Sequence, residues 1–172
     1  MNTPPTSPSP RGFAAEIIGG AQCPPLQVLG RITIGDVTEH FRMSTAHWQP
    51  QDYRNSWALA LRELLAAEVV DSCLVTSITE PAMSNFISCW PLYRRGEKVH
   101  VQEALIFLDV LEVPFDEHRP WLSVRPRRTV SEDGLAISEW VTSVGDVREF
   151  ARTLGTAEGG EVDDGLREDL RG

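Results

Sequence analysis

Ser88–Phe107, SCWPLYRRGEKVHVQEALIF, is the stretch that decides the fold. Two apolar runs flank a short polar turn containing Gly96, and the second run opens with Val99 and Val101 alternating with polar residues. Two such runs joined by a few residues with a glycine predict a β-hairpin. Its aromatic and aliphatic content is too high for a hairpin lying alone on a surface, so we expect it in the centre of a sheet. Pro91 in the first arm cannot donate to a strand ladder, which favours an edge position or a bulge.

Helical periodicity is clearest just upstream, over Gln51–Ala67. Pro50 suits the first turn of that helix, where a missing N–H costs nothing. A shorter closing helix is expected over Gly145–Leu154, with Asp146 near its N-terminus. The longer helix carries one apolar stripe at helical spacing, which we expect in the core: Tyr53, Trp57, Leu61, Leu64 and Leu65.

Three further segments have strand patterns. In Leu26–Met43 the apolar phase changes at Gly35-Asp36, which predicts either one bent strand or a hairpin. Val69–Ile78 is apolar in both phases, as in a strand covered on both faces, and Ile137–Ser143 is expected to be the last strand. Together the segments predict an α+β fold: a mainly antiparallel β-sheet packed against one principal helix, with a short C-terminal helix.

The chain length is typical of one domain, which we place at residues 26–154. Met1–Pro10 is rich in proline, serine and threonine. Residues 1–25 are expected to be disordered or loosely attached, although Phe13–Ile18 suits a short helix or an attached strand. Residues 155–172 are expected to form a disordered acidic tail. The tail from Thr156 carries six acids and two arginines, a net charge of −4, which leaves −5 for the rest of the chain.

The charge and the cysteines narrow the class of protein. A net charge of −9 argues against a nucleic-acid partner, because phosphate contact needs a basic surface. The negative charge suits a basic protein partner, but a protein that is acidic only for solubility would have the same composition. No apolar run approaches a membrane span and the N-terminus lacks a secretory pattern. Three cysteines without a C-x-x-C pair predict reduced thiols, so we expect a cytoplasmic protein with no membrane contact.

Catalytic chemistry is not visible in the sequence. The histidines are scattered without metal-ligand spacing, and no nucleophile motif or phosphate-binding glycine loop occurs. We therefore expect no catalytic residue, metal or cofactor. A protein-binding module leaves no such motif, whereas a small hydrolase with dispersed carboxylates stays an alternative. The basic residues Arg125, Arg127 and Arg128 are expected to pair with the acidic segment Asp109–Glu117. The candidate partner-binding residues are Asp36, Glu39, Asp109, Glu112, Asp116 and Glu117.

Several stretches together resemble one family. They are GRITIGDVTEHF at Gly30–Phe41, DYRNSWALAL at Asp52–Leu61, SCLVTS at Ser72–Ser77, WPLYRRGEKVHVQ at Trp90–Gln102 and TVSEDGLAISEW at Thr129–Trp140. They are similar to small immunity proteins of bacterial contact-dependent growth inhibition (CDI) systems. The resemblance implies a monomeric cytoplasmic antidote that binds the C-terminal toxin domain of a cognate effector and neutralises it without catalysis. Many such toxins are nucleases with basic surfaces. A binding module for another partner is the second reading of the same fold.

Overall fold

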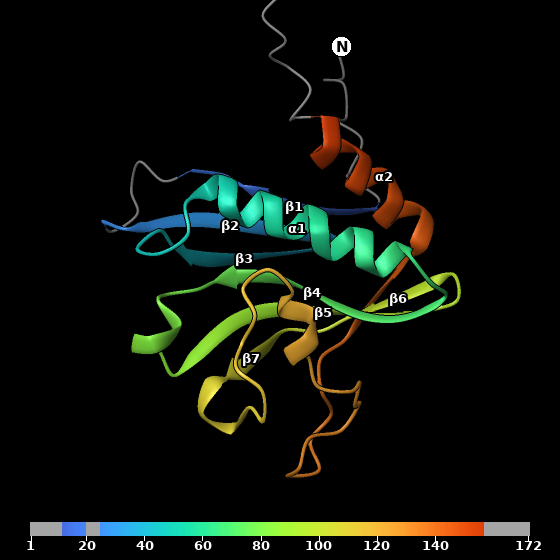
Figure 1. The fold of residues 1–172 in the computed structure, drawn as a ribbon. Coiled ribbons are helices and arrows are strands. Elements are labelled where there is room, and N and C mark those ends of the chain that lie inside the picture. Colours follow the sequence, from blue (N-terminus) through green and yellow to red (C-terminus); the bar gives the residue numbers. More distant parts are fainter. Residues whose placement is uncertain (1–11, 20–24, 157–172) are drawn as a thin grey trace, which may run out of the picture.

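The computed structural model describes residues 12–19 and 25–156, which form two helices and two antiparallel sheets (Figure 1). The first sheet has the order β1-β2-β3. The second has the order β4-β5-β6-β8, with β7 also paired to β5. The α+β prediction is confirmed, with two sheets where one was expected. The elements are β1 (Phe13–Ile17), β2 (Gln27–Ile34), β3 (Val37–Ser44), α1 (Pro50–Leu65), β4 (Val69–Ser77), β5 (Phe86–Arg95), β6 (Lys98–Val101), β7 (Ala104–Phe107), β8 (Trp140–Ser143) and α2 (Val144–Thr156). Three short 3-10 turns are η1 (Pro81–Met83), η2 (Leu108–Val110) and η3 (Pro120–Ser123).

The predicted hairpin lies in the centre of the second sheet. Strand β5 pairs with β4 on one side and with β6 and β7 on the other. Gly96 opens the two-residue turn between β5 and β6 with a φ of +65°, a value that only glycine adopts without strain. Gly35 has a φ of +59° in the matching turn between β2 and β3. The hairpin alternative for Leu26–Met43 is therefore the correct one.

Pro91 does not lie on an edge strand, so that part of its prediction is wrong. It pairs with Cys73 of β4, and its carbonyl accepts a hydrogen bond from the Gln102 amide at 3.1 Å. Gln102 and Glu103 interrupt the outer arm between β6 and β7. The missing N–H of Pro91 thus falls where the facing ladder is already broken.

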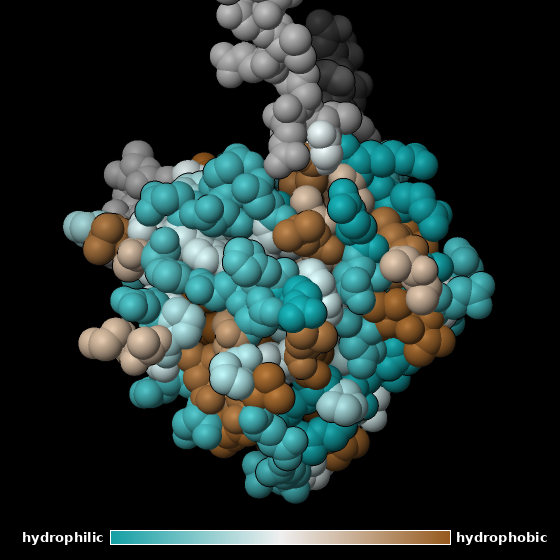
Figure 2. Space-filling model, viewed as in Figure 1, coloured by the Kyte–Doolittle hydropathy of each residue, from teal (hydrophilic) through white to brown (hydrophobic). Residues whose placement is uncertain are grey.

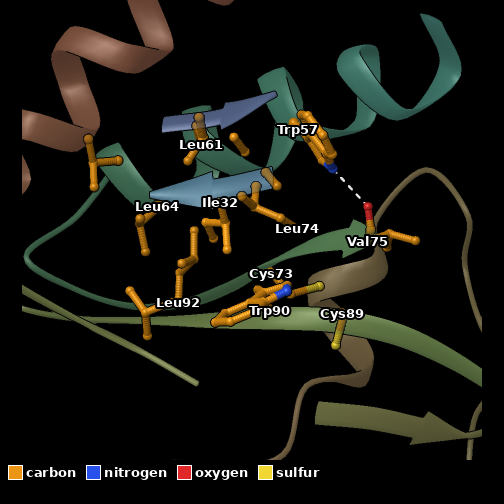
Figure 3. Close-up of a cluster of buried hydrophobic side chains, with 14 of the residues drawn as sticks. Ile32, Trp57, Leu61, Leu64, Cys73, Leu74, Val75, Cys89, Trp90 and Leu92 are labelled. Carbon is orange, nitrogen blue, oxygen red and sulfur yellow. Dashed lines mark hydrogen bonds between the residues drawn. The ribbon is translucent and has the colours of Figure 1, made fainter. Parts of the chain in front are cut away.

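One face of the second sheet packs on α1, whose buried stripe includes Tyr53, Trp57 and Leu61. Figure 3 shows Trp57 and Leu61 of this stripe on the side of α1 that faces the sheet. Trp57 is 1% exposed, and its Nε1 donates to the carbonyl of Val75 at 2.7 Å. Ser72 Oγ donates to the carbonyl of Ala60 at 2.8 Å, which fixes helix against strand at a second point. The helix prediction is confirmed, and polar as well as apolar contacts hold it in place.

The first sheet closes the same core from a second direction. Ile32 of β2 points toward Leu61, Leu64 and Leu74 (Figure 3). The Tyr53 hydroxyl donates to the carbonyl of Ser44 at 2.7 Å and accepts from the amide of Ile78 at 3.1 Å, so it joins β3 to the end of β4.

The folded part begins before the predicted start at residue 26. Strand β1 pairs with β2, and the ring of Phe13 packs edge-on against Phe150 of α2 at 5.6 Å. Of the two alternatives for Phe13–Ile18, a helix or a strand, the strand is correct. Residues 1–11, 20–24 and 157–172, which hold Cys23 and most of the predicted tails, lie outside the described residues.

The other face of the second sheet is covered by the irregular segment 108–139. Trp121 and Val124 pack against the core, and the Tyr93 hydroxyl donates to the carbonyl of Arg125 at 3.0 Å. The last strand, β8, starts at Trp140 rather than at the predicted Ile137, because residues 129–137 form a separate turn with a bridge between Val130 and Ala136. Strand β4 is consequently buried on both faces, as its apolar pattern predicted.

Truncating Trp57 to alanine should lower the free energy of unfolding by about 3–5 kcal/mol, because it opens a cavity and leaves the Val75 carbonyl without its donor. Urea titration measures the change. Leu59→Ala is the matched control, since Leu59 lies on the same helix and is 42% exposed. Equal losses in the two variants would contradict the assigned packing.

Candidate functional site

The acids of the segment predicted to bind a partner divide into two pairs that differ in exposure and bonding. Asp109 and Glu112 are exposed and have no hydrogen bond or ion pair within the described residues. Asp116 and Glu117 are half-buried and engaged in the fold. The four carboxylates therefore do not form one uniform patch.

Glu117 connects the irregular segment to the link between β3 and α1. Its Oε1 lies 2.5 Å from His47 Nε2 and accepts from Trp48 Nε1 at 3.0 Å. Asp116 accepts from the His118 amide at 2.9 Å and from Arg119 Nε at 3.0 Å. The amide of His118, followed by Arg119, lowers the pKa of Asp116. These two acids shape the loop rather than offering free charge.

The two acids predicted on the first hairpin separate in space. Asp36 is exposed in the turn between β2 and β3. Glu39 lies on β3 and lines a hollow of about 670 Å³ together with Glu103, which follows β6. Leu105, Ile137 and Trp140 form the apolar lining of that hollow, and Ala104 and Ser138 complete it.

Glu103 was missed by sequence reasoning as a candidate residue. Its only sequence signal is the break in apolar alternation at Gln102-Glu103 inside the hairpin's second arm. Nothing in that signal pointed to Glu39.

Glu139 accepts the hydrogen bonds that attach the end of the irregular segment to the sheet. It accepts two hydrogen bonds from Arg127, at 2.6 and 2.8 Å, and one from Gln102 Nε2 at 2.7 Å, and His100 Nδ1 lies 3.1 Å away. Its side chain is only 15% exposed. The paired hydrogen bonds from Arg127, aided by that from Gln102, lower the pKa of Glu139 to about 2.

This arrangement corrects the prediction for the basic cluster. Arg127 pairs with Glu139, and Arg128 lies 3.7 Å from Glu132, so neither pairs with the Asp109–Glu117 segment. Two arginines at the hairpin turn are also engaged within the fold. Arg94 is 6% exposed and donates to the carbonyls of Gly96 and Leu64, while Arg95 pairs with Asp71 at 2.8 Å.

The cysteine thiols among the described residues are not accessible from the surface. Cys73 and Cys89 are buried free thiols, and their mutual contact together with burial raises the pKa of Cys73 well above its usual value. A thiol held protonated in this way is a poor nucleophile. Within residues 12–19 and 25–156, no group of three or more His, Cys, Asp and Glu side chains is placed to hold a metal ion. No helix in that part of the chain is long and apolar enough to cross a membrane.

Carboxylates and apolar side chains line the hollow at Glu39 and Glu103, and surfaces of this composition occur where one protein binds another. Comparison with known proteins gives the particular class. The family described as the CdiI N-terminal domain matches residues 43–150. The immunity protein CdiI of Enterobacter cloacae subsp. cloacae is 37% identical over 123 residues, which cover 72% of this chain and 83% of that protein.

A solved structure agrees with the sequence match. A chain from the CdiA-CT/CdiI toxin and immunity complex of Enterobacter cloacae superposes with a TM-score of 0.76 and 33% sequence identity, covering 84% of this chain and 99% of the other. The protein belongs to the CdiI immunity protein family of contact-dependent growth inhibition systems, which confirms the resemblance seen in its sequence.

Replacing Glu117 by alanine should destabilise the fold by about 1 kcal/mol, because the Trp48 indole N–H loses its acceptor and the irregular segment loses its attachment to His47. Glu112→Ala is the control, since that exposed carboxylate has no partner in the described part of the chain. Thermal unfolding and hydrogen exchange at the His118 amide report the two effects. A loss as large in the Glu112 variant would refute a structural role specific to Glu117.

Glu139 should make the protein acid-sensitive in a defined window. Because its folded pKa is lowered, the carboxylate stabilises the fold above its unfolded pKa of about 4.3, and that stability is lost as pH falls toward about 2. Glu139→Gln should be less stable at pH 7 and lose less stability across this window than the parent. Urea titrations from pH 7 to pH 2 measure both quantities.

Glu132→Gln is the control for that titration, because Glu132 is 79% exposed and should leave the pH dependence unchanged. An identical pH dependence in the Glu139 variant and the parent would show that this carboxylate is not coupled to folding.

Proposed function

We propose that this chain binds and neutralises the C-terminal toxin domain of a cognate CDI effector, that the toxin is a nuclease, and that the chain acts in the cytoplasm as a monomer without catalysis. The observation that carries the proposal is the fold shared with a chain of a solved toxin and immunity complex, together with 37% identity to an immunity protein. Inhibition of this kind needs a complementary surface and no reactive group.

The charge of the chain supports a basic toxin. The net charge is −9, and nucleases that bind phosphate present basic surfaces. Asp36, Glu39, Asp109 and Glu112 are exposed carboxylates with no partner among the described residues, so their charges are available to a toxin. Long-range attraction between such surfaces raises association rates at low salt. Asp116 and Glu117 hold the segment that carries Asp109 and Glu112 in place.

Co-expression tests the proposal directly. Bacteria that express the C-terminal domain of the effector encoded beside this chain should stop growing, and co-expression of the chain should restore growth. The purified pair should elute together in a one-to-one complex, and the chain should suppress RNA or DNA cleavage by the toxin domain.

A toxin from an unrelated CDI system is the specificity control and should not be rescued. Growth arrest that persists with soluble chain present would overturn the proposed neutralisation. Rescue from a toxin that cleaves no nucleic acid would overturn only the assignment of a nuclease.

A further inference from the structure

The described residues leave part of one face of the second sheet, the face that packs on α1, about half exposed. In the register of β5 with β7, Phe86 lies opposite Phe107 and Ser88 lies opposite Leu105, so these residues share a face with Trp90. Trp90 is 2% exposed beneath the core, whereas Phe86, Leu105 and Phe107 are 45–46% exposed. Figure 2 shows that apolar side chains reach the surface at several places on one face of the molecule, among hydrophilic ones. Exposed apolar groups of this kind mark interaction sites.

The hollow beside these residues carries two carboxylates, so a partner that fills it should be positively charged there. Glu39 from the first sheet and Glu103 from the second both line it, with Leu105 and Trp140. Neither carboxylate has an ion pair or hydrogen bond among the described residues, and the lining contains no lysine or arginine. The Trp140 ring packs on Trp90 with centroids 5.4 Å apart, which holds that wall in position.

We propose that this surface, the β7 face, is where the toxin domain docks. It consists of Phe86, Leu105, Phe107, Trp140, Glu39 and Glu103. An apolar side chain of the toxin packs over Leu105 and Phe107, and a neighbouring lysine or arginine enters the hollow between the two carboxylates and lies against Trp140. This inference rests on the proposed function and adds the surface and the chemistry of its partner.

Charge complementarity favours the β7 face over the neighbouring hollow at the irregular segment. That second hollow, of about 620 Å³, contains exposed Val110, Val113 and Leu122, but its lining includes Arg119 and Arg125 beside Glu112 and Asp116. Cations of the same chain therefore lie beside its acids, and one of them, Arg119, is bonded to Asp116. Strand β7 also pairs only with β5, so its outer edge is unoccupied within the described fold.

Binding of a catalytically inactivated toxin domain, measured by biolayer interferometry at low and high salt, tests the assignment. Glu39→Lys with Glu103→Lys should slow association at least about tenfold at low salt, with the difference shrinking at high salt. Leu105→Ala with Phe107→Ala should speed dissociation and weaken affinity at least about 30-fold at either salt concentration. Every variant should keep the parent's circular dichroism spectrum, because the altered side chains are exposed.

Glu63→Lys is the matched control, an exposed charge reversal on α1 outside the hollow, and should change affinity less than about threefold. If the parent binds the toxin domain tightly and both β7-face variants bind it with the same affinity, the inference is overturned and the proposed function stands. If the parent chain does not bind the toxin domain, both are overturned. Should the apolar double variant fail to fold, the charge-reversal pair alone decides, since Glu39 and Glu103 are exposed and make no hydrogen bond or ion pair within the described fold.

Discussion

Burial of β4 and β5 on both faces is the constraint on which the rest of the structure depends. A sheet whose central strands are apolar in both phases must be covered twice, and only one face receives a helix. Trp57 and Ser72 fix that helix by hydrogen bonds to strand and helix carbonyls. The second cover is a segment without strands, whose own polar backbone is held by side chains and turns.

That second cover explains how acids are used in this protein. An irregular segment lacks ladder hydrogen bonds, so Glu117 and Glu139 attach it to the β3–α1 link and to the sheet. These carboxylates accept several donors each and are tied to folding. Asp109 and Glu112, on the same segment, keep their charge free for solvent or a partner. Acidic composition alone does not distinguish the two uses, because the difference lies in which donors packing brings near.

The chain belongs to the CdiI family of immunity proteins, so its surface residues are the ones to consider for function. Residues at a binding surface determine which partner binds, whereas buried residues are constrained by packing. The β7 face illustrates the separation. Trp90 belongs to the framework, whereas Leu105 on the same sheet face lies beyond the reach of α1 and stays accessible.

The sequence by itself determined the local elements and the class of fold. Gly96 predicted the central turn, and the apolar stripe through Trp57 and Leu61 predicted the helix. Apolar residues at both odd and even positions predicted the buried strand. These patterns were readable because residues close together in the sequence form them. Only the tertiary structure decided that Pro91 is central, that Arg94 is buried, and that Glu39 and Glu103 line one hollow. Those outcomes depend on how two separate sheets pack. The periodicity of a sequence reports local structure and does not show which distant residues come close together. The fold was therefore largely predictable from the sequence. For the site, the sequence predicted only which acidic residues to consider, and the packing of the sheets decided which of them are bonded within the fold.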